Sequence, residues 1–230
     1  MSNPVRFVAV RSRSSQGSRG RPGAPPLKPH REHRHVPLAA RLPKFIGGPA
    51  DAAMKLMLLR VMIIGLGSVG GRIATHVARI GVAMLWLVDP KCFKSESLLT
   101  HEIEPRDVGK SKARTIARRC KAISPATRVF HFDGGVECLP LDAFADADLV
   151  VMATDNLAAE IEVGQRCLCL GKPLVQASVH GDTLTAQVRW FGNTDAQGPC
   201  PACGFGQTEW RMLDEQTRFS CEGPPTHNPP

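Results

Sequence analysis

The stretch from Val61 to Gly70, Val-Met-Ile-Ile-Gly-Leu-Gly-Ser-Val-Gly, joins an apolar run to a glycine-rich turn, and a second apolar run ends at Asp89. The turn has the pattern G-x-G-x-x-G, which marks the passage from a buried strand to a helix. In this pattern Gly65 allows a tight turn, Gly67 lets the backbone approach a phosphate, and Gly70 lets helix and strand pack closely. The sequence therefore predicts a phosphate-binding loop between a strand and a helix.

The residues after the loop extend the prediction to a whole nucleotide. A helix that begins at the loop points its unpaired N–H groups and its positive dipole end at a phosphate. Asp89 follows Gly70 by 19 residues, at the tip of the next expected strand, where a carboxylate accepts hydrogen bonds from a ribose. The same elements serve ATP and NAD, so both nucleotides stay open at this point.

Apolar segments alternate with amphipathic ones along the rest of the chain. Strands are expected at 60–64, 83–88, 128–132, 148–153 and 173–177, and helices at 68–80, 111–123 and 157–170. Repeated βαβ units with continuous apolar strands predict an α/β fold, a Rossmann-like, mostly parallel sheet with helices on both faces. The alternating run 183–191 is typical of an antiparallel or half-exposed strand. A Cys-containing C-terminal appendage follows it.

The charge of the chain is concentrated at its N-terminus. Of the net charge of +8, residues 1–50 hold ten Lys/Arg against one acid, Glu32, while the remaining 180 residues are close to neutral. This composition predicts a disordered basic tail over 1–50. The element pattern predicts a Rossmann-like nucleotide-binding domain over 51–193, followed by a Cys-containing loop segment over 194–230 that looks truncated. A basic arm of this kind could bind nucleic acid or an anionic surface. We favour a solvated leader, or residues upstream of a later start at Met54 or Met57, so nucleic acid is not an expected partner.

The cysteines and the apolar stretches indicate in which cellular compartment the protein works. Eight cysteines are scattered through helical and strand patterns, which favours a reducing cytoplasm over a disulfide scaffold. No apolar stretch has the length of a membrane span, and no secretory signal is visible. We therefore expect a cytoplasmic protein that does not use a membrane.

Two polar positions follow expected strands or open expected helices. Lys112 lies in the first turn of the basic helix 111–123, where an ammonium can act on a phosphate, although a solvated basic face is the simpler reading. Asp155 follows the strand 148–153, at the edge where open α/β sheets bind ligands. A carboxylate there suits Mg²⁺ on a triphosphate, and either it or Asn156 is a good cap for the next helix.

The appendage contains the turn Cys200-Pro201-Ala202-Cys203. A C-x-x-C turn is half of a structural Zn²⁺ site, and a metal is favoured here over a redox pair or two unoccupied thiols. Cys221 and His227 are the downstream candidates for further ligands, and Cys221 is alternatively an exposed nucleophile.

Taken in order, the glycine loop, Asp89, the stretch Gly-Lys-Ser-Lys-Ala at 109–113, the stretch Ala-Thr-Asp-Asn at 153–156 and the Cys-Pro-Ala-Cys turn resemble the ubiquitin-activating-enzyme superfamily, with its ThiF, MoeB and HesA adenylyltransferases. The resemblance covers about residues 41–221. It implies ATP- and Mg²⁺-dependent adenylation of the C-terminal glycine carboxylate of a ubiquitin-like or sulfur-carrier protein ending in Gly-Gly. It also implies that residues 51–193 form an ATP-binding adenylation domain, and that the protein forms a homodimer or pairs with a hetero-partner.

The resemblance assigns roles by position. Gly65, Gly67 and Gly70 would line the nucleotide, Asp89 would hold the ribose, Lys112 would contact phosphate, Asp155 would hold Mg²⁺ and ATP, and Arg41 would reach the partner subunit's ATP. The chain departs from the family pattern at Thr100, where the family has a phosphate-binding arginine, and in lacking a second C-x-x-C. Two rival readings stay open: an NAD-dependent oxidoreductase, and a degenerate relative that binds a nucleotide or a partner without turnover.

Overall fold

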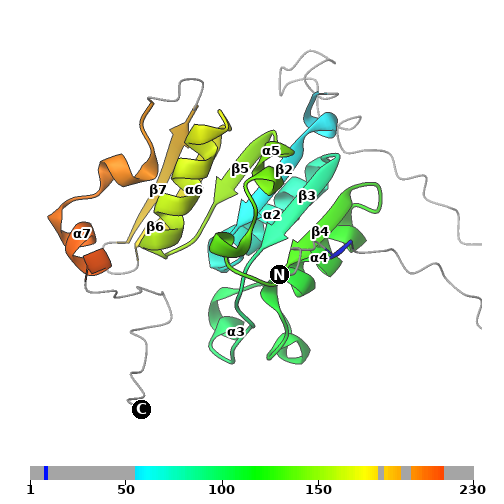
Figure 1. The fold of residues 1–230 in the computed structure, drawn as a ribbon. Coiled ribbons are helices and arrows are strands. Elements are labelled where there is room, and N and C mark those ends of the chain that lie inside the picture. Colours follow the sequence, from blue (N-terminus) through cyan, green and yellow to red (C-terminus); the bar gives the residue numbers. More distant parts are fainter. Residues whose placement is uncertain (1–7, 10–54, 181–183, 193–197, 215–230) are drawn as a thin grey trace, which may run out of the picture.

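The structure, a computed structural model, describes residues 8–9, 55–180, 184–192 and 198–214. These residues form one sheet in the order β1-β4-β3-β2-β5-β6-β7 (Figure 1). The strands are β1 (Val8–Ala9), β2 (Arg60–Ile64), β3 (Met84–Val88), β4 (Arg128–Phe132), β5 (Leu149–Met152), β6 (Leu174–His180) and β7 (Thr185–Phe191). All neighbours from β4 to β6 pair in parallel, and β1 and β7 add antiparallel edges. The predicted α/β fold is confirmed.

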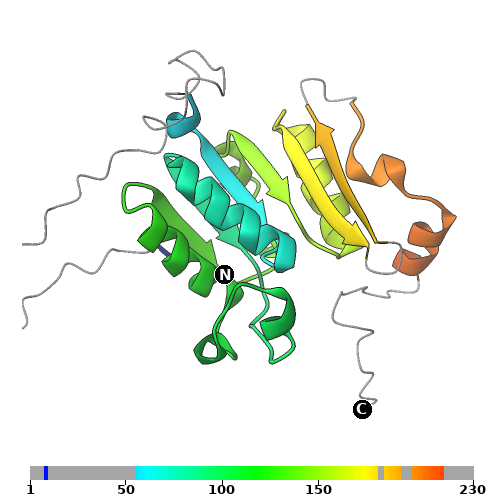
Figure 2. The ribbon, with the colours of Figure 1, turned by 180° about the vertical axis from the view of Figure 1, so that it is seen from behind.

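Helices cover both faces of the sheet, as predicted. Figure 2 shows α2 (Ser68–Ile80) and α4 (Lys112–Ile123) in front of the sheet, while α5 (Asp142–Ala145) and α6 (Leu157–Cys169) lie behind it. Shorter elements lie in the connections, namely α3 (Ser97–Thr100), η3 (Pro105–Asp107), η4 (Val136–Cys138), η5 (Pro201–Gly204) and α7 (Gln207–Asp214). A single helical turn over 55–58 precedes β2.

The central strands are apolar on both sides because each side faces a separate core. In β2, Val61 and Ile63 pack with α2 and α4 in one core, while Met62 and Ile64 pack with α5 and α6 in the other. Successive side chains of a strand point to opposite faces, so a strand covered twice needs an uninterrupted apolar run. Burying one such aliphatic side chain fully contributes about 1.5–3 kcal/mol.

The order of the strands creates one edge suited to a ligand. Strand β2 pairs with β3 on one side and with β5 on the other, so the chain runs outward in both directions from β2. The loops that leave the carboxyl ends of β2 and β5 therefore diverge toward opposite faces. Open α/β sheets bind ligands in the crevice at such a switch point.

The C-terminal part differs from the prediction. The sequence predicts no helix beyond Phe191, yet η5 and α7 form there, with Trp210 packed edge-on against Phe205 at 5.7 Å between ring centroids. The η5 turn lies against α6, since a Cβ on Gly164 would come within 2.6 Å of the Pro201 ring. The domain boundaries themselves stay a prediction.

The structure covers only part of two further expectations, which concern the N-terminal segment and membrane-spanning helices. Strand β1 lies inside the segment 1–50 that the composition predicts as disordered, and the rest of that segment, with Arg41, lies outside the described residues. Among the described residues, no helix combines the length and the apolar character needed to cross a bilayer.

Candidate functional site

The glycine loop connects β2 to α2 and touches the loop that follows β5. Gly65 has a φ of +83°, and a Cβ on it would lie 2.7 Å from the carbonyl oxygen of Ala153. A Cβ on Gly70 would lie 1.9 Å from the carbonyl oxygen of Gly65. Both glycines are therefore required by the packing of the chain itself, as the sequence pattern predicts.

Gly67 differs from these two glycines, because an added Cβ on it would meet no described atom within 4 Å. It is the N-cap residue of α2, and no side chain caps that end of the helix. The first-turn N–H groups of α2 therefore face the open side of the loop, where a helix end attracts an anion. This arrangement is what a phosphate needs.

Asp89 follows β3 and organises the loop from the side. Its carboxylate accepts hydrogen bonds from the N–H groups of Leu66 at 2.6 Å and Lys91 at 2.8 Å. Burial raises the pKa of Asp89, while these two N–H groups and the charges of Lys112 and Lys91 oppose the rise. An ionised carboxylate offers about four lone-pair positions, and these two hydrogen bonds use two of them.

Lys112 is not part of the solvated basic face that the sequence left as the simpler reading. The first residue of α4, it is only 3% exposed, whereas Arg114 and Arg118 on the same helix are exposed. Its Nζ lies 5.8 Å from the centre of the Phe93 ring. The structure thus brings a buried ammonium to the carboxylate of Asp89, on which its charge acts.

The loop after β5 contains both candidates for the cap of the next helix, Asp155 and Asn156. Asn156 is the cap of α6, and its Oδ1 accepts hydrogen bonds from the N–H groups of Ala158 at 3.0 Å and Ala159 at 3.2 Å. Asp155 is half-buried and is not needed as the cap. Since Gly65 contacts Ala153, this loop and the glycine loop form the two sides of the switch point.

A buried carboxyl group that the sequence analysis does not single out lies one turn beyond Asp155. Glu160 of α6 accepts a hydrogen bond from Gln176 Nε2 of β6 at 2.7 Å. Burial raises the pKa of Glu160 to about 7; the charge of Asp155 adds to the rise, and Gln176 and Arg189 oppose it. Helical periodicity alone places Glu160 on the buried face, but its partner on β6 comes from the fold.

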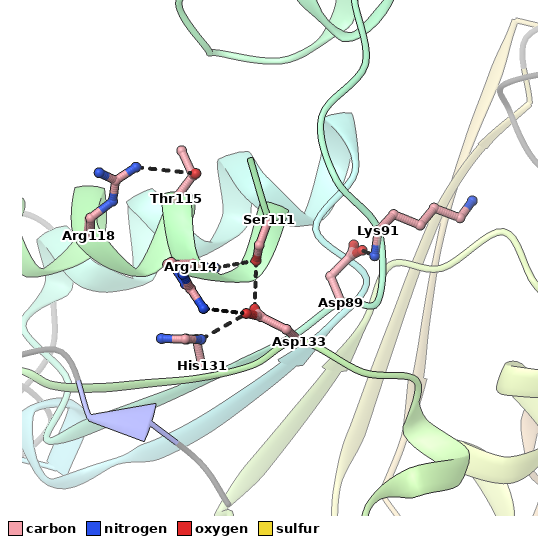
Figure 3. A network of polar contacts seen from close by, with 8 residues as sticks. All are labelled: Asp89, Lys91, Ser111, Arg114, Thr115, Arg118, His131 and Asp133. Atoms are coloured by element: carbon pink, nitrogen blue, oxygen red, sulfur yellow. Dashed lines mark hydrogen bonds and ion pairs between the residues drawn. The ribbon is translucent and has the colours of Figure 1, made fainter. Parts of the chain in front are cut away.

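A second group missed from the sequence holds the start of α4 (Figure 3). Asp133, directly after β4, accepts hydrogen bonds from Ser111 Oγ at 2.6 Å and Arg114 Nη2 at 3.3 Å. Its Oδ1 lies 3.3 Å from Nδ1 of the buried His131. The signal in the sequence was the position of Asp133 immediately after an expected strand, at the same edge as Asp89.

The region around Thr100 shows how the chain departs from the family pattern. Thr100 is exposed, and its Oγ1 lies 2.8 Å from His101 Nδ1. Arg106 is the nearest arginine along the chain, and Glu104 engages it through contacts of 2.9 Å and 3.0 Å. Arg106 therefore already has an acidic partner in this structure.

The two cysteines of the appendage lie together, with 3.7 Å between their Sγ atoms. The N–H group and thiol of Cys200 lower the pKa of Cys203. Two thiolates supply half of a tetrahedral zinc site. Within the described part of the chain no group of three metal-ligating side chains occurs, and Cys221 and His227 lie outside it. The zinc assignment stays a prediction.

Comparison with known proteins agrees with these features. The sequence model of the ThiF family matches residues 40–222. Adenylyltransferase and sulfurtransferase MOCS3-1 of Zea mays is 29% identical over 157 residues, covering 67% of this chain and 33% of the relative. Probable adenylyltransferase/sulfurtransferase MoeZ of Mycobacterium tuberculosis is 31% identical over 150 residues, covering 64% and 38%.

Two proteins of Escherichia coli complete the comparison. Sulfur carrier protein ThiS adenylyltransferase is 31% identical over 133 residues, covering 57% of this chain and 53% of the relative. The crystal structure of MccB with succinimide superposes with a TM-score of 0.59 at 20% identity, covering 76% of this chain and 52% of that one, and supports the fold alone. The chain thus spans between a third and about half of the length of these relatives.

Alanine substitutions should separate the two kinds of glycine in the loop. Gly65→Ala forces a Cβ against the Ala153 carbonyl at a positive φ, so it should lower the free energy of unfolding by about 2 kcal/mol or more. Gly67→Ala adds a methyl group in open space and should change it by less than about 1 kcal/mol. Urea titration of both variants measures the difference; equal losses would contradict this geometry.

Glu160 should make the stability depend on pH. Its pKa is about 7 in the folded protein and 4.5 ordinarily, so the folded state binds more protons between these values. The stabilisation is complete below pH 4.5 and is lost as the pH rises through about 7. Between pH 5 and pH 8 the wild type should lose about 1–3 kcal/mol relative to Glu160→Gln. Parallel pH–stability curves would show that Glu160 ionises normally.

Proposed function

Because the chain belongs to the ThiF family, we propose that it uses ATP to adenylate the C-terminal glycine carboxylate of a ubiquitin-like or sulfur-carrier protein ending in Gly-Gly. One observation carries the proposal. The structure gathers the glycine loop, Asp89 and Lys112 around the carboxyl ends of β2 and β3, and puts the Asp155 loop against the glycine loop. Adenylyltransferase is also the activity named for relatives that match most of this chain.

The reaction needs positioning and charge rather than a covalent intermediate on the enzyme. A carboxylate oxygen of the carrier forms a bond to the α-phosphorus, and the bond from that phosphorus to the pyrophosphate oxygen breaks. Two anions must meet, so the barrier falls when fixed positive groups offset their charge. The α2 N-terminus and the Lys112 ammonium would supply this charge, and Asp89 would fix the ribose.

Asp155 fits the position of a Mg²⁺ ligand. Mg²⁺ in nucleotide sites is bound by one or two carboxylates together with phosphate oxygens. The half-buried Asp155 lies at the carboxyl end of β5 and leaves the capping of α6 to Asn156. When bound, the ion would neutralise negative charge on the phosphates.

We further propose zinc at Cys200 and Cys203 and a cytoplasmic location. The paired thiols and the lowered pKa of Cys203 suit a metal, and metal analysis of the wild type against Cys200→Ser would check it. Every cysteine of the described residues is a free thiol, which is typical of a reducing compartment.

The rival readings now have different standing. The family match disfavours an NAD-dependent oxidoreductase, which would have no use for Lys112 and Asp155. A degenerate relative that binds a nucleotide without turnover would keep the loop and Asp89 and would differ only in activity. Thr100 and the engaged Arg106 are the features that favour it.

We also propose a homodimer that forms through one face of β6 and β7. In the register of these strands Trp190 lies opposite Val175, which packs on the α2 side, so Trp190, Val188 and Val179 share that face. These three side chains are 62%, 72% and 54% exposed. In Figure 2 no described helix lies in front of the ribbon of β7. A second copy related by a two-fold axis would cover both apolar faces at once.

ATP–pyrophosphate exchange tests the proposed reaction. Exchange should require both Mg²⁺ and a carrier protein ending in Gly-Gly, and Lys112→Ala and Asp155→Ala should each lower it by a factor of about a hundred or more. The matched controls are Lys55→Ala and Asp142→Ala, which remove an exposed lysine and an exposed aspartate away from the loop. ATP binding without any exchange would establish the degenerate reading instead.

Sedimentation velocity tests the dimer. Trp190→Glu places a charge in the apolar face and should convert the dimer to a monomer at micromolar concentration. Leu99→Glu is the matched control, because Leu99 is also a large exposed apolar residue but lies on α3. A wild type that sediments as a monomer, or a Trp190→Glu variant that stays dimeric, would contradict the assignment.

A further inference from the structure

We propose that Asp133 is a positioning residue for Lys112, holding the first turn of α4 through Ser111 so that the buried ammonium is presented at the nucleotide site. The inference rests on the proposed function, in which Lys112 contacts phosphate. It concerns a residue to which neither the family resemblance nor the glycine-loop pattern gives a role. Asp133 acts through another residue and is not itself assigned to touch ATP.

Figure 3 shows the hydrogen bonds that link Ser111, Arg114 and Asp133. Ser111 Oγ lies 2.6 Å from Asp133 Oδ1 and 3.0 Å from the backbone nitrogen of Arg114. An ionised carboxylate only accepts, so the single hydroxyl proton of Ser111 goes to Asp133. A lone pair of the same oxygen is then left to accept the N–H group of Arg114. Asp133 therefore orients the hydroxyl group that caps α4.

Asp133 anchors the Ser111 cap to the carboxyl end of β4. Asp133 directly follows Phe132, which is paired with Val88 at the end of the neighbouring strand β3. The N–H group of Asp89 donates to the carbonyl oxygen of Phe132 at 3.2 Å. Asp89 and Asp133 thus leave adjacent strand ends, one holding the glycine loop and the other holding α4.

The position of Lys112 depends on the Ser111 cap. Lys112 is the residue after Ser111, and its N–H group donates to the carbonyl oxygen of Lys91 at 3.0 Å. Ser111 also forms an isolated antiparallel bridge with Cys92. The segment after Asp89 therefore holds the start of α4 from one side and Asp133 holds it from the other. The core side chains Ala113 and Ile116 hold the inner face of the same helix. Without Asp133 the first turn loses its polar anchor on β4, so the Lys112 side chain is placed less firmly.

The geometry also predicts how this role differs from a purely structural one. Asp133 is 33% exposed and its ion-pair partner Arg114 is 64% exposed. Ion pairs with that exposure contribute little to the free energy of unfolding. The position of a charged catalytic group is far more sensitive, because a displacement of about 1 Å can lower a rate by about a hundredfold. Loss of Asp133 should therefore affect turnover much more than stability.

The test is a set of four variants measured by ATP–pyrophosphate exchange and by thermal unfolding. Asp133→Ala should lower kcat by about tenfold to a hundredfold with a much smaller change in the KM for ATP. Its Tm should fall by no more than about 4 °C. Asp133→Asn keeps an oxygen that can accept from Ser111 and should stay within about fivefold of the wild-type kcat. The control is Asp142→Ala, which removes an exposed aspartate of α5 and should leave kcat unchanged.

Ser111→Gly breaks the same link from the other side. Glycine is well tolerated as an N-cap and costs little stability there, yet it has no hydroxyl to reach Asp133. This variant should lower kcat as Asp133→Ala does. If Asp133→Ala proves too unstable to assay, Ser111→Gly still decides the question.

A nucleotide-free measurement separates failure of this inference from failure of the proposed function. Acetylation of Lys112 by an N-hydroxysuccinimide ester, followed by mass spectrometry, should be slow in the wild type, where Lys112 is 3% exposed, and severalfold faster in Asp133→Ala. A wild type without exchange would reject the proposed function, and acetylation would still test the positioning. Equal acetylation rates, a wild-type kcat in Asp133→Ala, or an Asp133→Asn variant as slow as Asp133→Ala would each overturn it.

Discussion

The hydrogen bond from the Leu66 N–H group to the carboxylate of Asp89 is the contact on which the arrangement of the site depends. This buried hydrogen bond, 2.6 Å long, joins the glycine loop after β2 to the end of β3. Burial of Asp89 disfavours its charge and raises its pKa, and the N–H groups and two lysines oppose only part of that rise. A carboxylate held in this way both shapes the loop and keeps lone pairs for a ligand. The loop geometry and the proposed ribose contact therefore depend on the same carboxylate.

The sequence predicts the parts of the fold that follow from local patterns. Helix α2 begins at Ser68 and ends at Ile80 as expected, because an apolar stripe runs between a glycine turn and Gly81, which adopts a φ of +83° at the C-cap. Strand β2 likewise matches its expected range of 60–64, because a strand buried on both faces is apolar throughout. In both cases the deciding information lies within about fifteen residues of the element.

Contacts between distant segments are what the sequence could not supply. Lys112 is buried, and its ammonium lies over the ring of Phe93, which belongs to a separate segment of the chain. The basic pattern of the helix sequence therefore gives no hint of this burial. The link from Ser111 to Asp133 spans 22 residues, and the bond from Gln176 to Glu160 spans 16. Helix α7 was missed for a related reason: it is short, and its stability comes from contacts such as Trp210 against Phe205 rather than from a strong pattern of its own.

Charge at the site gives Lys112 more weight here than the family pattern alone would suggest. Thr100 stands where a phosphate-binding arginine is expected, and Arg106 is engaged by Glu104. In the described part of the chain, the cationic side chains whose charge acts on Asp89 are those of Lys112 and Lys91, and Lys91 is exposed while Lys112 is buried. A buried ammonium acts on a phosphate through a lower effective dielectric than an exposed one, so its contribution is larger and also more dependent on position. In the proposed reaction, with Thr100 at the position of the family arginine, the chain would therefore depend more strongly on the residues that fix Lys112.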